Sequence, residues 1–312
     1  MPKLLRAPSR PYRSRVMDSS HWDNYRPRPD DVIICTFPKV GTTWTQRIVD
    51  LLFHQNADAR PVTSNVPWLD ATIFGPVEGH LATLEAQTER RAIKSHLPFD
   101  SLPIFDEIKY IHVARDGRDA ITSMHNHELG FRKEFREAVA GSMPAGMRPP
   151  ETPEDPRTYF LERLAQAETY KPDDADLPFF EFENTYWRER KRPNVLFVHF
   201  ADMKKDLAGE MQRISSFLGI DTPASRLKSL AAVAEFGAMK AQGKELMPAV
   251  EIAFDRGSDR FMNKGTNGRW KDFLTAEDIA RYETLAHKKF SPPEAAWIAN
   301  GRSVGDPRNL PD

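Results

Sequence analysis

A short apolar run that ends in a glycine turn is the feature that most constrains the fold of this chain. Residues Val32 to Phe37 are mostly β-branched, aromatic or small, a composition typical of a buried strand. The following Pro38-Lys39-Val40-Gly41 predicts a turn, and Thr42 or Thr43 can cap a helix after it. This order of strand, glycine turn and helix belongs to α/β proteins, and it offers backbone amides to an anion.

The same alternation recurs along the chain. We expect further strands at Arg91 to Ser95, Tyr110 to Ala114 and Val195 to Phe200. Helices are expected after Gly117 to about His127, near 157–170, near 178–190, and from Asp202 to a stop at Gly219. The pattern predicts a single α/β domain with a central, mostly parallel sheet flanked by helices. Lys39, His96 and Arg115 each follow a predicted strand, at the sheet edge where ligands bind in such folds.

Two segments do not fit this alternation. Residues 1–27 hold many Arg and Pro with little periodicity, so we expect an N-terminal arm, mostly irregular, before a domain spanning 28–312. Residues 130–156 are rich in Gly, Pro and charge, which predicts a long mobile loop or lid.

Composition limits the partners. The 312 residues have a formal net charge of -1, which does not favour a nucleic acid or an anionic membrane as partner. No apolar run approaches the roughly 20 residues of a membrane span, and the first 15 residues lack the apolar core of a secretory signal. The single cysteine, Cys35, cannot form an internal disulfide, so we expect a cytoplasmic protein with Cys35 buried in a strand.

The loop after the first strand has the parts of an anion site. Gly41 allows close approach of the backbone, and the Thr42 and Thr43 hydroxyls with the Lys39 ammonium complete a cage. A lone Gly-Thr-Thr is more simply a capped helix, but the preceding strand, Lys39 and Trp44 favour function. In a Walker loop the lysine follows the last glycine, whereas Lys39 precedes Gly41. No Walker-B strand is evident, so group transfer without a metal is the simpler hypothesis.

This segment resembles the cytosolic sulfotransferase family. The similar residues are Arg28-Pro29-Asp30-Asp31 leading into Thr36-Phe37-Pro38-Lys39-Val40-Gly41-Thr42-Thr43-Trp44. The family loop typically reads Pro-Lys-Ser-Gly-Thr-Thr-Trp, and Val40 in place of Ser keeps the backbone amide. The resemblance, from about Arg28 to about Thr275, implies a fold related to P-loop kinases. It also implies that the loop holds the 5′-phosphosulfate of 3′-phosphoadenosine-5′-phosphosulfate (PAPS), with Trp44 on the adenine.

The second strand ends in a candidate base. Ile93-Lys94-Ser95-His96-Leu97-Pro98 resembles the family's Lys-Thr-His-Leu-Pro, whose histidine is the catalytic base. An imidazole that takes the proton of a hydroxyl contributes about 10²–10⁴-fold in rate. A structural role is the alternative for any histidine, and it suits His112, inside a strand, better. Lys39 is the candidate that stabilises charge on the leaving phosphate, and Lys94 is a second contact.

Two later motifs resemble the family's 3′-phosphate site. Arg115 and Ser123 fit its Arg-x-x-x-Asp-x-x-x-Ser pattern, and a guanidinium offers two parallel hydrogen bonds to a phosphate. The segment from Arg260 to Trp270 resembles Phe-x-Arg-Lys-Gly-x-x-Gly-x-Trp, which assigns Phe261, Lys264 and Gly265 to this site. Asn263 stands where Arg is usual and removes one charge.

Contacts with the adenine are predicted at two phenylalanines. Phe200 precedes Ala201-Asp202-Met203-Lys204, where the family has a Tyr, and Phe236 lies in a segment resembling Ser-Phe-x-x-Met-Lys. Glu235 replaces that Ser, and a carboxylate beside phosphates is unfavourable unless it points away. A core role fits both phenylalanines equally well.

The sequence therefore predicts a PAPS-dependent sulfotransferase, with in-line transfer to a hydroxyl and no metal. The acceptor is expected to be a phenolic, steroidal or other lipophilic alcohol. The alternatives are a nucleotide kinase-like phosphotransferase and a non-catalytic PAPS-binding protein. The family's dimer pattern fits Lys271 and Thr275 but not Ala276 and Ala280, which leaves the oligomeric state open. Aromatic side chains expected to line the acceptor pocket are Trp22, Tyr25, Trp68, Phe74, Phe131 and Phe135.

Overall fold

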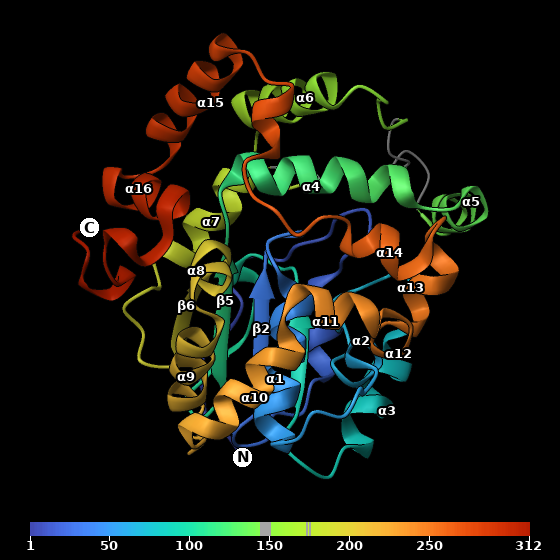
Figure 1. The fold of residues 1–312 in the computed structure, drawn as a ribbon, viewed down its shortest axis with the longest axis vertical. Helices are drawn as coiled ribbons and strands as arrows, with labels where there is room; N and C mark the ends of the chain where they lie inside the picture. Colours follow the sequence, from blue (N-terminus) through green and yellow to red (C-terminus); the bar gives the residue numbers. More distant parts are fainter. Residues whose placement is uncertain (144–150, 173, 175) are drawn as a thin grey trace.

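The computed structural model describes residues 1–143, 151–172, 174 and 176–312. At its centre is a four-stranded parallel sheet with the order β3-β2-β5-β6 (Figure 1). The four predicted strands are confirmed to within one residue at each end, and so is the single α/β domain. Their bounds are Val32–Thr36 for β2, Ala92–Ser95 for β3, Lys109–Ala114 for β5 and Val195–His199 for β6.

The register of the sheet brings the predicted site together. Cys35 of β2 lies beside Ser95 of β3 and His112 of β5, and Ala114 of β5 lies beside His199 of β6. Every residue of β2 and β6 is buried, as expected for a parallel sheet covered on both faces. Because the four strands end at one edge, the loops that follow them meet there.

Helices cover the sheet and its carboxyl edge. In Figure 1 the β2 arrow points toward α4, which crosses above the strand ends, and α1 and α10 lie below it. The bounds of the helices are Thr42–His54 (α1), Val62–Asn65 (α2), Val77–Ala86 (α3), Gly117–Gly130 (α4), Lys133–Ser142 (α5), Pro156–Thr169 (α6), Phe179–Trp187 (α7), Phe200–Lys205 (α8), Leu207–Phe217 (α9), Ala224–Ala234 (α10), Phe236–Ala241 (α11), Gly243–Leu246 (α12), Pro248–Ala253 (α13), Gly257–Met262 (α14), Ala276–Lys289 (α15) and Pro292–Asn300 (α16). Short 3-10 turns are Ser19–Asn24, Phe99–Ser101, Arg269–Asp272, Gly301–Val304 and Pro307–Asn309.

The N-terminal segment is more ordered than its composition predicts. Strand β1 (Leu4–Arg6) pairs antiparallel with β4 (Ile104–Phe105). Tyr12, Trp22 and Tyr25 are buried in the same core as the sheet. Outside β1 and the 3-10 turn Ser19–Asn24 the segment has an irregular backbone, and scattered aromatic residues anchor it to the core without a helical or strand period.

Three local predictions need correction. The segment 130–156 contains helix α5, so its first part is not a loop, while residues 144–150 lie outside the described residues. The helix expected from Asp202 is two helices, which meet at Asp206, whose side chain caps α9. The N-cap of α1 is Gly41, without a side-chain cap from Thr42 or Thr43.

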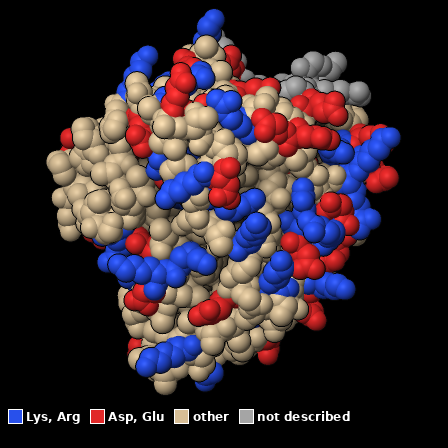
Figure 2. Space-filling view, turned by 45° about the horizontal axis from the view of Figure 1, so that its top comes forward, with Lys and Arg blue, Asp and Glu red and all other residues tan. Residues whose placement is uncertain are grey.

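Figure 2 shows basic and acidic side chains side by side over much of one face, beside a broad uncharged area on the left. Basic and acidic side chains are interspersed there, in keeping with the formal net charge of -1. None of the helices described here is both long and apolar enough to cross a membrane.

Candidate active site

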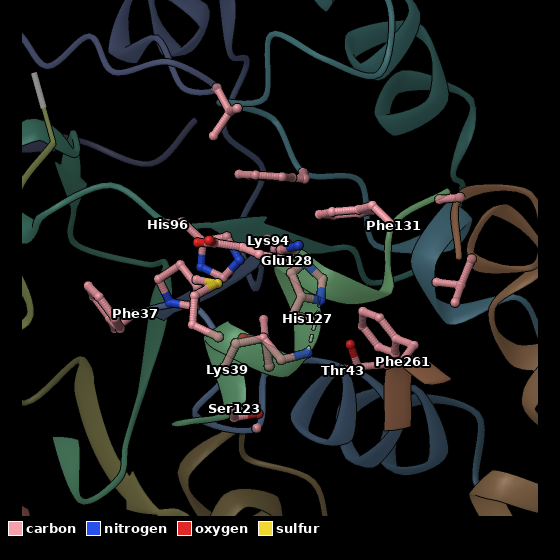
Figure 3. Close-up of a pocket in the computed structure, with 18 of the residues that line it drawn as sticks. Phe37, Lys39, Thr43, Lys94, His96, Ser123, His127, Glu128, Phe131 and Phe261 are labelled. Carbon is pink, nitrogen blue, oxygen red and sulfur yellow. Dashed lines mark hydrogen bonds between the residues drawn. The ribbon is translucent and has the colours of Figure 1, made fainter. Parts of the chain in front are cut away.

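A cavity of about 1180 Å³ opens at the carboxyl edge of the sheet. This exceeds the roughly 300–1,000 Å³ typical of a pocket for one small molecule. Lys39 after β2, His96 after β3 and Arg115 after β5 all line it, as predicted. Figure 3 shows Lys39 and His96 bordering this cavity with residues of α4.

The turn after β2 has an unusual backbone. Lys39 has a φ of 68° and Gly41 a φ of 116°, both in the left-handed region that L side chains rarely adopt. A side chain at Gly41 would place its Cβ 3.0 Å from Phe200. Thr42 and Thr43 both line the cavity; the Thr42 hydroxyl lies 2.6 Å from that of Thr36, and Thr43 is labelled in Figure 3. Backbone strain at a ligand-facing turn is typical of a functional site.

Lys39 is a half-buried cation, and no carboxylate of the described residues forms an ion pair with it. Its ammonium lies 3.3 Å from Nδ1 of His127 and 4.2 Å from the centre of the Phe261 ring. Burial, with the nearby charges of Lys94 and Arg115, lowers the pKa of Lys39 to about 7. A bound anion would oppose these effects, so this lysine is suited to take up a proton when a phosphate binds.

His96 is held in one tautomer. Its Nδ1 lies 2.6 Å from the carbonyl oxygen of Thr36, which only accepts, so Nδ1 carries the hydrogen. Nε2 then has a free lone pair, and the histidine lines the cavity. Burial, followed by the charge of Lys94, lowers the pKa of His96 well below its usual value. The imidazole is therefore neutral at pH 7 and able to accept a proton.

Asp70, which sequence reasoning missed, fixes the loop that carries His96. Its buried carboxylate accepts hydrogen bonds from the backbone N–H of His96 at 3.1 Å and from Nε1 of Trp68 at 2.7 Å. Nε1 of Trp22 lies 3.4 Å from its other oxygen. The Trp68 ring meets the His96 ring edge to face at 5.0 Å. No local motif marked Asp70, because two of its partners, His96 and Trp22, lie 26 and 48 residues away.

Lys94 is a second cation in the cavity. Its ammonium lies 4.2 Å from the centre of the Trp68 ring. Burial lowers its pKa to about 8, with Asp70 acting in the opposite direction. Lys39 and Lys94 therefore titrate near pH 7 and pH 8, so the charge of both side chains in this range depends on whether an anion is bound.

Arg115 joins two loops. It donates to the carbonyl oxygen of Lys39 at 3.1 Å and to that of Thr266 at 3.0 Å. Its Nε and Nη2 both donate to Oδ1 of Asn267, at 3.0 and 2.9 Å. Its guanidinium also stacks on Phe200 at 4.2 Å, and burial lowers its pKa to about 10. Since four of its five N–H groups are used, a two-bond contact with phosphate requires that Asn267 release them.

The loop after α14 closes over Arg115. Gly265 has a φ of 60°, and a Cβ there would lie 2.4 Å from the Phe236 ring. Asn263 has a φ of 49° and a ψ of -118°, outside the left-handed helical region in which Asn is enriched. Other residues predicted to contact the nucleotide also line the cavity: Thr42, Thr43, Trp44, Ser123, Phe200, Phe261 and Lys264.

Three predicted residues have structural contacts that bear on their roles. Val40 is fully buried and does not line the cavity with its side chain. Trp44 donates to the carbonyl oxygen of Ala234 at 2.7 Å and meets Phe200 edge to face at 5.4 Å. Glu235 is exposed and outside the cavity lining, so its carboxylate does not oppose an anion there.

The structure adds polar groups that the motifs did not single out. Lys204 and Arg269 also line the cavity, and so does His127. The motifs did not predict these three residues, because each lies next to a motif and not at a position that the motif specifies. Lys204 and Arg269 increase the positive charge around the predicted anion site, whereas burial lowers the pKa of His127 and keeps it neutral.

One part of the cavity lining is aromatic, as predicted for the acceptor pocket. Trp68, Phe74, Phe131 and Phe135 line it as predicted, and Phe74 is 48% exposed. Trp22 and Tyr25 do not line it, which corrects that prediction. They are core residues because both are tied to buried carboxylates, Tyr25 through a 2.6 Å hydrogen bond to Asp31.

Two residues predicted to be structural are buried in the core. His112 is fully buried, stacks on Tyr186 at 4.0 Å, and lies 2.9 Å from a Glu183 oxygen. Burial raises the pKa of the Cys35 thiol well above its usual value. Neither residue contributes to the cavity.

Comparison with known proteins identifies the family. The model of the sulfotransferase domain matches residues 29–292, so the chain belongs to the sulfotransferase family and is a sulfotransferase. It is 34% identical to a glycolipid sulfotransferase of Mycobacterium bovis (strain BCG / Pasteur 1173P2) over 96% of both chains. It is 28% identical to rat sulfotransferase 1 family member D1 over 86% of both chains.

Solved structures share the fold. Mouse sulfotransferase SULT7A1 complexed with PAP superposes with a TM-score of 0.66 at 22% identity, covering 89% of this chain and 91% of that one. Retinol dehydratase in a complex with retinol and PAP gives 0.68 at 23% identity, covering 88% and 85%. These similarities agree with the central parallel sheet described above.

Proposed function

We propose that this protein transfers the sulfuryl group of PAPS to the hydroxyl of a lipophilic alcohol, with His96 as general base. The observation that carries the proposal is the meeting of a neutral histidine, with its Nε2 lone pair free, and cations that have no carboxylate partner. Among the described residues, no salt bridge includes Lys39, Lys94 or Arg115.

The cavity fits a donor with phosphates at both ends. The strained turn at Lys39 and Gly41, with Thr43, suits the 5′-phosphosulfate. Arg115, Ser123 and the loop of Asn263, Lys264 and Gly265 suit the 3′-phosphate. The adenine has Trp44, Phe200 and Phe236 beside it. PAPS supplies the activated sulfuryl group, and the titratable lysines supply charge that increases on anion binding.

The proposed transfer has one proton to move. As the acceptor oxygen forms its bond to sulfur, the bond from sulfur to the 5′-phosphate oxygen breaks. Nε2 of His96 accepts the hydroxyl proton, while Nδ1–H stays on the Thr36 carbonyl. Lys39 stabilises the charge left on the 5′-phosphate. This assigns acid–base work to His96 and electrostatic work to Lys39.

The acceptor class follows from the aromatic lining. Trp68, Phe74, Phe131 and Phe135 offer an apolar surface to the body of an alcohol. The glycolipid sulfotransferase among the relatives supports an acceptor of this lipophilic class.

The test uses sulfur-labelled PAPS, a panel of phenols, sterols and long-chain alcohols, and two variants. His96→Asn keeps a donor for the Thr36 carbonyl but removes the base, so transfer should fall about 10²–10⁴-fold while binding of adenosine 3′,5′-bisphosphate (PAP) remains. His54→Asn, far from the cavity, is the matched control. Unchanged transfer in His96→Asn would remove the base assignment.

The same material separates the alternatives. Phosphate transfer from ATP that depends on Mg²⁺, without sulfuryl transfer, would indicate a kinase-like enzyme. Tight PAP binding without transfer to any alcohol would indicate a binding protein.

A further inference from the structure

A second histidine, His127, borders the cavity, and its ring nitrogens have the reverse hydrogen-bonding roles to those of His96. Nδ1 of His127 lies 3.3 Å from the Lys39 ammonium, and Figure 3 marks this contact. In its charged form Lys39 has only donors, so Nδ1 of His127 then accepts from it and the ring hydrogen is on Nε2. His96 has the reverse arrangement, because its Nδ1 donates to the Thr36 carbonyl.

The surroundings of His127 keep it neutral. Phe131, Phe254 and Phe261 surround the ring, with centroids 4.7, 5.0 and 5.7 Å away. Burial, and then the charges of Lys39, Lys94 and His96, lower its pKa well below the usual value. Among the described residues no hydrogen bond from its Nε2–H is found, so this donor is available to a molecule in the cavity.

We propose that His127 selects acceptors carrying a second oxygen near the reacting hydroxyl, such as the sugar headgroup of an amphiphile. This inference rests on the proposed sulfuryl transfer. His96 accepts the proton of the reacting hydroxyl, and His127 donates to the neighbouring oxygen. The aromatic side chains near the mouth, Phe74 and Phe135 with ring centroids 6.4 Å apart, receive the apolar part.

The geometry of Lys39 permits this arrangement during the reaction. An ammonium has three N–H groups, so Lys39 can contact a phosphate and Nδ1 of His127 together. Contact with the anionic donor favours its charged form, which keeps Nδ1 of His127 an acceptor and Nε2 a donor. His127 is thus a specificity residue, whereas His96 remains the base.

The test compares octyl glucoside with octanol, which share a chain but differ in neighbouring oxygens. A glutamine amide lies where Nε2 of histidine lies, and an asparagine amide lies where Nδ1 lies. His127→Gln should therefore keep the donor to the acceptor, and His127→Asn should keep only the contact with Lys39. His127→Phe removes both.

For octyl glucoside, we expect kcat/KM to fall about 10-fold in His127→Asn and His127→Phe, as one hydrogen bond is lost, and to stay within about 3-fold in His127→Gln. For octanol, His127→Asn should match the wild type, because it keeps the contact with Lys39, whereas any loss in His127→Gln and His127→Phe should reflect the loss of that contact. Equal losses for both acceptors in His127→Asn, or a wild type that prefers octanol, would overturn the inference while leaving the proposed function intact.

Failure of the proposed function gives a different result. If neither alcohol is sulfated, calorimetric binding of both to the PAP-saturated protein decides about His127. Octyl glucoside bound about 10-fold more tightly than octanol, with loss in His127→Asn, would support the selection of a second oxygen. Equal binding would contradict it.

Discussion

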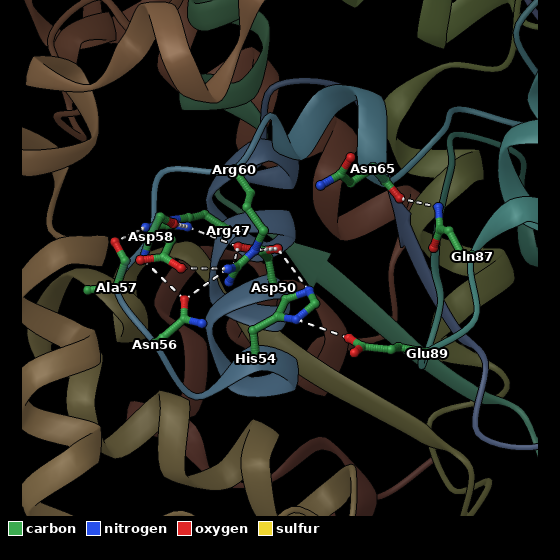
Figure 4. Close-up of polar contacts among 10 residues, drawn as sticks. All are labelled: Arg47, Asp50, His54, Asn56, Ala57, Asp58, Arg60, Asn65, Gln87 and Glu89. Atoms are coloured by element: carbon green, nitrogen blue, oxygen red, sulfur yellow. Dashed lines mark hydrogen bonds and ion pairs between the residues drawn. The ribbon is translucent and has the colours of Figure 1, made fainter.

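Helix α1 connects two polar regions that treat buried charge in opposite ways. At its N-terminal end, Lys39 and Arg115 line the cavity and form no salt bridge among the described residues. In its middle, Arg47 is fully buried and donates to Asp50 at 2.9 Å (Figure 4). Arg60 donates to the same carboxylate at 3.1 Å.

The difference separates a site from a structural cluster. The Arg47 guanidinium also donates to the carbonyl oxygens of Asp58 at 2.7 Å and Ala57 at 3.2 Å, which fixes the chain after α1. Its charge is balanced within the fold. The charge of Lys39 is instead opposed by like charges, and an anionic ligand is what balances it. Unbalanced buried charge therefore indicates where the ligand binds.

The largest effect on stability is expected from the paired cluster. Arg47→Met leaves Asp50 buried with only part of its partners, so the free energy of unfolding should fall by about 3 kcal/mol. PAP affinity, measured at a temperature below the onset of unfolding, should not change. Arg281→Met, which breaks an exposed pair with Glu168, is the control and should cost less than about 1 kcal/mol. If Arg47→Met lost PAP affinity but not stability, Arg47 would belong to the binding site and not to a structural cluster.

Lys39→Met should give the opposite pattern. Removing a cation that burial and like charges disfavour should raise the free energy of unfolding of the free protein by about 1 kcal/mol. PAP affinity should fall by about 1.5–3 kcal/mol, the usual range for a hydrogen bond to a charged group. Lys109→Met is the matched control, because that ammonium also lies over an aromatic ring, Phe217, outside the cavity. Lower stability in Lys39→Met would mean that Lys39 is structural.

A smaller effect is expected from substituting Asn267, because a carboxylate at this position would give Arg115 an ion-pair partner like that of Arg47. Asn267→Asp places a carboxylate against Arg115, so it should weaken PAP about 10-fold by competing with the 3′-phosphate. Asn267→Ala frees the same N–H groups and should bind PAP at least as well as the wild type. Calorimetric titration measures both, and equal affinity in the two variants would exclude a role for Arg115 in phosphate binding.

Sequence reasoning succeeded where chemistry is local. The loop of Lys39 and Gly41 and the turn after β3 could be predicted because strand, turn and helix are contiguous. Asp70 and Asn267 could not, since Asp70 acts on His96 across 26 residues and Asn267 on Arg115 across 152. The aromatic core contacts of the N-terminal segment were missed for the same reason. His127 was passed over because its role depends on a contact with Lys39, 88 residues away.

The most direct test of the comparison is a calorimetric titration with PAP at pH 8 in two buffers of different ionisation enthalpy. At pH 8 the pKa of about 7 leaves most of Lys39 neutral in the free protein, and Lys94, near 8, is partly neutral. An anion raises both pKa values, so the account predicts tight PAP binding, independent of Mg²⁺, with net uptake of about one proton. Lys39→Met should take up less. PAP binding without proton uptake, or Mg²⁺-dependent preference for ADP, would contradict the claim that these cations are left unpaired for the donor.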